Sequence, residues 1–176
     1  MASIITWLRR WRRLLVNRCA DAGDIRTRLP QAALDRLAAQ VAASEQHHGG
    51  ELRICIEAGL PWSYIRRDAT ARDRALTLFG KLRVWDTEHN NGILIYLLLA
   101  ERAIELVADR GLNVRVDSDQ WTKIAAELSQ TLAAQQFEQG LTQAIDALSA
   151  LLIAHFPATP GQRDRNELPN EPVVLA

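Results

Sequence analysis

Residues that could bind a cation lie in two short polar segments, one before and one after the most apolar part of the chain. The first segment contains Asp86 and Glu88, and the second contains Asp109. Carboxylate oxygens are the hard ligands that Mg²⁺ and Ca²⁺ prefer. The sequence therefore predicts a metal site with Asp86, Glu88 and Asp109 as ligands, if folding brings them together. Three further polar residues are candidates for the same site: Asn90, Asn91 and Arg110.

Each of these carboxylates also has an ordinary structural role open to it. Asp86 can cap a turn, Glu88 can be solvated, and Asp109 can fix its own turn or pair with Arg110. The two interpretations differ in one respect, which is whether the polar segments converge on a common point.

The apolar part between these segments predicts a β-hairpin. Residues 93–99 are almost entirely apolar, which is typical of a strand covered on both faces, and residues 104–108 predict the returning strand. Asn90, Asn91 and Gly92 favour a turn before the hairpin, because Asn and Gly tolerate positive φ. The returning strand would bring Asp109 back to that turn.

The elements around the hairpin predict the fold class. Residues 51–58 alternate between apolar and other side chains, as a strand does, and a helix beginning near residue 68 separates them from the hairpin. Two strands joined by a helix run parallel with a right-handed crossover. Helical periodicity predicts further helices at residues 30–48, 118–132 and 137–155. We expect a three-layer α/β domain, with a small mixed central sheet covered by helices on both faces.

No motif of a well-understood enzyme class occurs in the chain. His47 and His48 precede Glu51, but the spacing is not that of a zinc-binding helix, and an imidazole near a helix end usually contacts the last carbonyls. A phosphatase needs a nucleophile or a metal-activated water and a cationic phosphate contact. Arg110 next to Gly111 is compatible with such a contact. The residues alone favour a binding or accessory module.

The N-terminal segment predicts a basic amphipathic helix. Trp7, Trp11 and Leu15 fall on one side of residues 3–17, and the arginines lie largely opposite. Such a helix can lie on an anionic membrane, with Trp7 and Trp11 as the contacts. The helix can also dock on the domain itself. We expect docking, because burial in a protein groove stabilises a tryptophan side chain as much as burial in lipid does.

Composition limits the remaining possibilities. Lys and Arg number 21 in the 176 residues, as do Asp and Glu, so the balance indicates no nucleic-acid partner and leaves an unidentified protein partner. No apolar run approaches the roughly 20 residues of a membrane span, and arginines interrupt the place of a signal peptide, so we expect a cytoplasmic protein. The predicted organisation is a basic helix and connector (1–28), one domain (29–157) and a disordered tail (158–176).

Several strings of the sequence resemble the TPM-domain family. They occupy residues 85–88 (WDTE), 91–96 (NGILIY), 104–111 (IELVADRG) and 155–157 (HFP). In this order and spacing they are similar to the small bacterial branch without a signal peptide or membrane anchor, over roughly residues 29–157. The resemblance implies a central sheet between helices. It also implies that the protein binds a divalent cation, Ca²⁺ or Mg²⁺, and that it has acid phosphatase activity. Both properties have been attributed to some members.

Overall fold

The computed structural model describes residues 2–158 and 166–176, except for the side chains of residues 2–6 and 8–10. Two basic or polar helices open the chain and two long helices follow the hairpin. The helices are α1 (Ala2–Cys19), α2 (Ala22–Arg28), α3 (Gln31–Ser44), α4 (Trp62–Arg66), α5 (Ala71–Lys81), α6 (Arg110–Asn113), α7 (Ser118–Ala133) and α8 (Phe137–His155). The strands are β1 (Leu52–Glu57), β2 (Ile93–Leu98), β3 (Ala103–Ala108) and β4 (Val173–Leu175).

The four strands form one mixed sheet in the order β3-β2-β1-β4. β1 and β2 run parallel, with Ile54 opposite Ile95. β2 and β3 form the antiparallel hairpin, with Tyr96 opposite Glu105. The predicted hairpin and the predicted parallel crossover are both confirmed.

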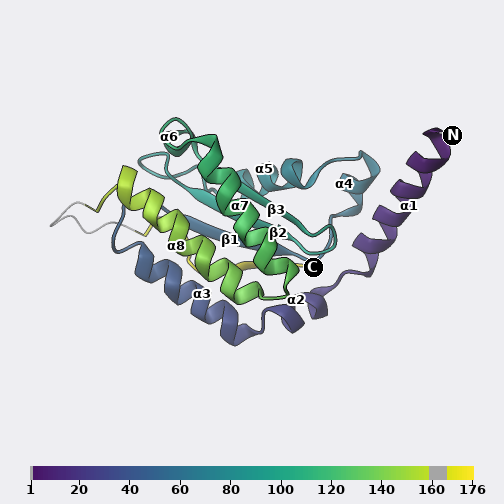
Figure 1. Ribbon diagram of the computed structural model, residues 1–176, viewed down its shortest axis with the longest axis horizontal. Coiled ribbons are helices and arrows are strands. Elements are labelled where there is room, and N and C mark those ends of the chain that lie inside the picture. Colours follow the sequence, from purple (N-terminus) through teal and green to yellow (C-terminus); the bar gives the residue numbers. More distant parts are fainter. Residues whose placement is uncertain (1, 159–165) are drawn as a thin grey trace.

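Helices cover both faces of this sheet, so the domain has three layers (Figure 1). On one face, Ile54 and Ile95 pack with apolar side chains of α3, α7 and α8. On the other face, Cys55 and Tyr96 pack with side chains of α4 and α5. Successive strand residues point to opposite faces, and every residue of β1 and β2 is buried, which explains why residues 93–99 contain almost no polar side chain. The predicted fold class is confirmed.

The end of the chain corrects one prediction. We expected residues 158–176 to be disordered, but Val173–Leu175 forms β4, which pairs in parallel with β1. Leu168 is also buried, in the core that contains Cys55. The prediction is wrong for residues 166–176, because an edge strand more than 100 residues away supplies the backbone partners that local composition cannot reveal. Residues 159–165 lie outside the described residues.

The start of the domain corrects a second prediction. We expected residues 1–28 to be a basic helix followed by a connector, but residues 22–28 form α2. The side chain of Asp21 accepts hydrogen bonds from the backbone N–H groups of Gly23 and Asp24, which satisfies the first turn of the helix. Ile25 and Leu29 are fully buried in the larger core. The domain therefore begins before residue 29.

Candidate functional site

The turn before β2 and the segment after β3 meet at one end of the sheet. The N–H of Asp109 donates to the carbonyl of Gly92 at 2.9 Å, and the N–H of Gly111 donates to the carbonyl of Asn90 at 2.9 Å. Asn90 has a φ of +52°, the left-handed conformation that Asn tolerates. A Cβ on Gly111 would lie 2.4 Å from the Asn90 carbonyl oxygen, so only glycine allows this approach.

The candidate ligands, however, have different surroundings. Asp86 and Glu88 are exposed, and the backbone N–H of Glu88 donates to the carboxylate of Glu167 at 3.1 Å. Asp109 is partly buried, and its Oδ1 accepts the N–H of Arg110 at 2.6 Å, which caps α6. Oδ2 of Asp109 is buried and has no hydrogen-bond partner within the described part of the chain.

The two asparagines and Arg110 also divide into different roles. Asn91 is almost fully buried and its side-chain N–H donates to the carbonyl of Gly49, which ties the start of β2 to the start of β1. Its backbone N–H donates to the hydroxyl of Thr87 at 3.1 Å. Asn90 forms the turn, and the Arg110 side chain is exposed. Asn91 is therefore a structural residue, whereas the exposed side chain of Arg110 can contact a ligand.

These residues do not fit a metal ion in the way the sequence suggested. Over residues 2–158 and 166–176, no group of three or more His, Cys, Asp or Glu side chains is placed to hold a metal ion. Asp86, Glu88 and Asp109 share one end of the sheet but do not form such a group. Cation binding by these carboxylates therefore remains a prediction.

The C-terminal segment adds side chains to this end that the sequence did not point to. The carboxylate of Glu51, which is buried, accepts the backbone N–H groups of Glu167 at 2.9 Å and Leu168 at 3.3 Å. Glu167 in turn accepts the N–H of Glu88. The segment after residue 165 therefore packs directly against the turn that was expected to bind the cation.

The buried histidine also has a structural role. His48 is fully buried, accepts the N–H of Gly50 on its Nδ1 at 3.3 Å, and forms an isolated β-bridge with Pro157. His47 is exposed, and its Nδ1 lies 3.1 Å from the carbonyl oxygen of Ala43, as expected for an imidazole at a helix end. Within the described residues, neither histidine belongs to a group of three or more His, Cys, Asp or Glu side chains that could hold a metal ion.

A second polar cluster, which was not predicted from the sequence, lies at the carboxyl end of β1. Glu57 accepts two hydrogen bonds from Nε and Nη2 of Arg74, at 2.9 and 2.6 Å, and one from the Tyr96 hydroxyl at 2.6 Å. Glu57 and Arg74 are 3% and 8% exposed. The Arg74 guanidinium also lies 5.0 Å from the centre of the Tyr64 ring. The only sequence signal was an arginine on the apolar side of α5.

Electrostatics in this cluster favour the charged form of Arg74. Burial alone would lower the pKa of Arg74, but the hydrogen bonds and charge of Glu57 outweigh it and raise that pKa. Burial, with a further contribution from Glu57, raises the pKa of Tyr96, and it raises the pKa of the Cys55 thiol to about 12. Every oxygen of Glu57 is hydrogen-bonded and covered, so the cluster has no open position for a substrate. It holds α5 against the sheet.

The second half of α1 docks on the domain through polar side chains. Nε of Arg13 donates to Glu101 at 2.7 Å, and its Nη1 donates to Asp68 at 3.1 Å. Asn17 is buried; its Nδ2 donates to Glu101 at 2.9 Å, and its Oδ1 accepts the N–H of Leu60 at 2.7 Å. These contacts fix the base of the helix beside α4 and the end of β1.

The apolar stripe of α1 does not dock, which corrects our expectation. Trp7, Trp11 and Leu15 are 58%, 49% and 61% exposed. Residues four apart lie on the same side of a helix, so Trp7, Trp11 and Leu15 form one stripe, and Arg13 and Asn17 form another. Because successive residues are turned by about 100°, the two stripes lie on different sides of α1. Figure 1 shows α1 extending away from the sheet. Arg13 and Asn17, together with Leu14, which packs against the core that contains Cys55, hold the opposite side of the helix and leave the tryptophans exposed.

Comparisons with known proteins agree with this architecture. The family model described as the TPM domain matches residues 24–151, which is most of the chain. The protein belongs to the TPM-domain family. Its structure is similar to the NMR structure of the BA42 protein from the psychrophilic bacterium Bizionia argentinensis, with a TM-score of 0.73 and 25% sequence identity. That match covers 83% of this chain and 94% of BA42. The comparison with curated proteins finds no match.

The match begins at residue 24, so α1 lies outside the part that the TPM family model describes. None of the helices within the described residues is both long enough and apolar enough to cross a membrane. The exposed stripe of α1 is thus an addition to a TPM domain.

Proposed function

We propose that this TPM protein is a binding or accessory module that attaches peripherally to an anionic membrane through α1. One observation carries the proposal: Trp7, Trp11 and Leu15 form an exposed stripe on a helix whose other side is held to the domain by Arg13 and Asn17. A large apolar stripe in water is unfavourable, and in a monomeric protein it usually marks an interaction surface.

Charge favours a lipid surface over an apolar protein groove. Residues 9–18 contain five arginines, of which Arg13 is paired with carboxylates of the domain. Arg12 and Arg18 are exposed. Each basic side chain near an anionic membrane contributes about 1 kcal/mol, and tryptophan rings are stable at the level of the lipid headgroups. The combination of arginines and tryptophans on one helix is typical of interfacial attachment.

The expected strength follows from the exposed area. A Trp side chain carries about 200 Å², so complete burial of a half-exposed ring stabilises attachment by about 2.5 kcal/mol. Immersion at a membrane interface is partial, so about half of this applies to each ring. Loss of both rings should therefore weaken partitioning about 50- to 100-fold.

Co-sedimentation with lipid vesicles tests the proposal. The full chain should bind vesicles that contain phosphatidylserine more strongly than vesicles of phosphatidylcholine alone, and added salt should weaken binding. The variant Trp7→Ala/Trp11→Ala should lose this binding. The matched control is Trp62→Ala/Trp85→Ala, which removes two tryptophans of similar exposure, 63% and 51%, from elsewhere on the surface. Equal loss in both variants, or no binding by the wild type, would overturn the proposal.

A location in the cytoplasm belongs to the same proposal. Neither of the two cysteines forms a disulfide; Cys19 is exposed and Cys55 is buried. Unpaired thiols fit a reducing compartment, and the cytoplasmic leaflet carries the anionic lipids. A protein partner at that surface would make the domain an accessory to a membrane-bound process.

Cation-dependent binding at Asp109 is a second candidate, supported by the buried and unpartnered Oδ2 of this residue. Titration with Mg²⁺, Ca²⁺ or Mn²⁺ alone, followed by backbone NMR, tests it. Shifts confined to residues 86–92 and 109–111 that disappear in Asp109→Asn would support it. The absence of a saturable response there would refute it, and phosphatase activity through this ion would fall with it.

A further inference from the structure

A cavity of about 220 Å³ lies at the carboxyl end of β2, at the opposite end of that strand from Asn90. The end of β2, the start of β3, the end of α7 and the start of α8 enclose it. Figure 1 shows α2 and the α7–α8 connection on this side of the sheet. In open α/β sheets, ligands bind outside the carboxyl ends of the parallel strands, and β2 belongs to the parallel pair of this sheet.

The inner wall of the cavity is apolar. Leu97 and Phe137 are buried side chains of the larger core, and Leu99, Ile104 and Leu132 pack against that core from the cavity side. An apolar wall of this kind stabilises a hydrocarbon chain or ring by excluding water.

The charged side chains of the lining are both basic. Arg28 and Arg102 line the cavity, and none of its lining residues carries a carboxylate. Arg28 is paired with Asp24 at 3.2 Å, which offsets its charge. Glu101, which precedes Arg102 in the chain, accepts instead from Arg13 at 2.7 Å. Arg102 is exposed and, in the part of the chain that the structure describes, makes no ion pair.

The backbone around the cavity holds two residues in an uncommon conformation. Arg102 has a φ of +52° and Gln135 a φ of +64°, both in the left-handed region that favours glycine. Both residues line the cavity. Such conformations cost about 1 kcal/mol or more and are concentrated at binding sites.

We propose that this cavity binds a small amphipathic carboxylate, with its hydrocarbon part against Leu97 and Phe137 and its carboxylate at Arg102. A guanidinium group matches a carboxylate in charge and can bind both oxygens at once. Since a cavity of about 150 Å³ holds benzene, this cavity accommodates an apolar part of about six to eight carbons. The site is independent of the membrane contact, because none of its lining residues belongs to α1.

A titration of the full chain with sodium octanoate, below its micellar concentration and followed by backbone NMR, tests the proposal. Saturable shifts should cluster at residues 97–104 and 129–137. 1-Octanol, which has the same chain without the charge, should bind at least tenfold more weakly, and inorganic phosphate should give no saturable shift. Equal affinity for octanoate and octanol, or shifts centred on α1, would overturn the proposal.

Two variants separate the charge from the cavity. Arg102→Asn removes the charge and keeps a residue that tolerates positive φ, and it should weaken octanoate binding at least tenfold. Its matched control is Arg83→Asn, because Arg83 is also exposed and has a φ of +56° but does not line the cavity. Ala133→Phe should fill the cavity and abolish binding. Unchanged affinity in Arg102→Asn and Ala133→Phe, or an equal loss in Arg83→Asn, would contradict the site.

Discussion

Replacing Arg74 by methionine tests whether the buried pair holds the second face of the sheet together. The substitution keeps most of the side-chain volume and removes the partner of a Glu57 carboxylate that is 3% exposed. Tyr96 would remain the one hydrogen-bond donor to that carboxylate within the described residues. Removing one partner of a buried ion pair costs about 3–5 kcal/mol, because the other charge is left uncompensated. This is a large part of the roughly 5–15 kcal/mol that stabilises a typical domain.

The chain contains a matched control for this variant. Arg36 and Glu138 form a pair of the same bidentate kind, at 2.6 and 2.9 Å, but the side chains are 62% and 37% exposed. An exposed pair contributes about 0–1 kcal/mol, so Arg36→Met should barely change the free energy of unfolding. Urea denaturation followed by tryptophan fluorescence measures both variants.

A second substitution separates loss of charge pairing from loss of packing. Glu57→Gln in the Arg74→Met background removes the uncompensated charge and leaves an oxygen to accept the Tyr96 hydroxyl. It should recover about 2 kcal/mol or more of the stability lost in Arg74→Met. The reasoning is refuted if Arg36→Met and Arg74→Met cost the same, or if adding Glu57→Gln destabilises the protein further.

Three further predictions concern reactivity, the tail and the turn. Burial, together with the charge of Glu57, raises the pKa of Cys55 to about 12, so iodoacetamide at pH 8 should modify Cys19 alone in the folded chain and both thiols in denaturant. Because folding raises the pKa of Cys55, the contribution of this thiol to the free energy of unfolding is complete below about pH 9 and should be lost as pH rises toward 12. Equal reactivity of both thiols in the folded chain would contradict the raised pKa. Leu168→Ala should cost about 2 kcal/mol or more and speed hydrogen exchange at residues 173–175, whereas a detached tail would show neither effect. Gly111→Ala should destabilise the protein by about 1–3 kcal/mol, because the added Cβ would meet backbone carbonyls. Gly80→Ala, whose Cβ would have nothing within 4 Å, should stabilise helix α5 by about 0.5–1 kcal/mol. Thermal unfolding distinguishes the two variants, and an equal shift in melting temperature would argue against the turn geometry.

The sheet could be predicted where its signals were local. The uninterrupted apolar run at residues 93–99 and the Asn90, Asn91 and Gly92 turn predicted β2 and its partner strand, because burial on both faces and turn formation are encoded by neighbouring residues. β4 could not be predicted in this way. Three apolar residues behind Pro172 become a strand only because β1 offers an unpaired edge.

The candidate site could be predicted only in part for a related reason. Antiparallel pairing brought Asp109 back to Asn90, as the hairpin required. Whether side chains on that backbone point at one another depends on local geometry, and Oδ1 of Asp109 is committed to capping α6. Pairing of Arg74 with Glu57 depends on how α5 crosses the sheet, which residue spacing does not specify.

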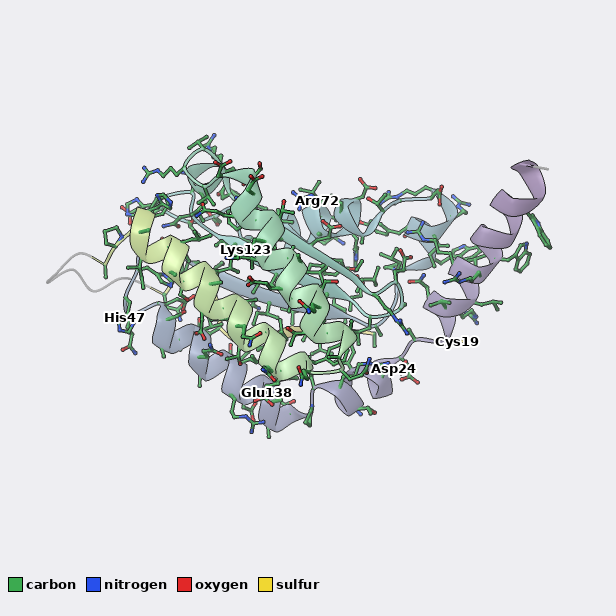
Figure 2. All side chains as sticks on the ribbon, viewed as in Figure 1. Cys19, Asp24, His47, Arg72, Lys123 and Glu138 are labelled. Atoms are coloured by element: carbon green, nitrogen blue, oxygen red, sulfur yellow. The ribbon has the colours of Figure 1, made fainter. Side chains whose placement is uncertain are left out.

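The N-terminal helix shows the same limit. Periodicity located the stripe of Trp7, Trp11 and Leu15 correctly, but it could not show which side of the helix would meet the domain. That choice is made by Arg13 and Asn17, whose partners lie in three distant segments. Figure 2 shows α1 joined to the domain near Cys19, with the rest of the helix extending outward.

Quenching of tryptophan fluorescence by lipids brominated in the acyl chain tests the membrane proposal most directly, since only rings that enter the bilayer are quenched. Vesicles with phosphatidylserine should quench the wild type and the Trp62→Phe/Trp85→Phe variant. They should leave the Trp7→Phe/Trp11→Phe variant, in which Trp62, Trp85 and Trp121 remain, almost unquenched. Equal quenching of the two double variants, or none in the wild type, would contradict attachment through α1.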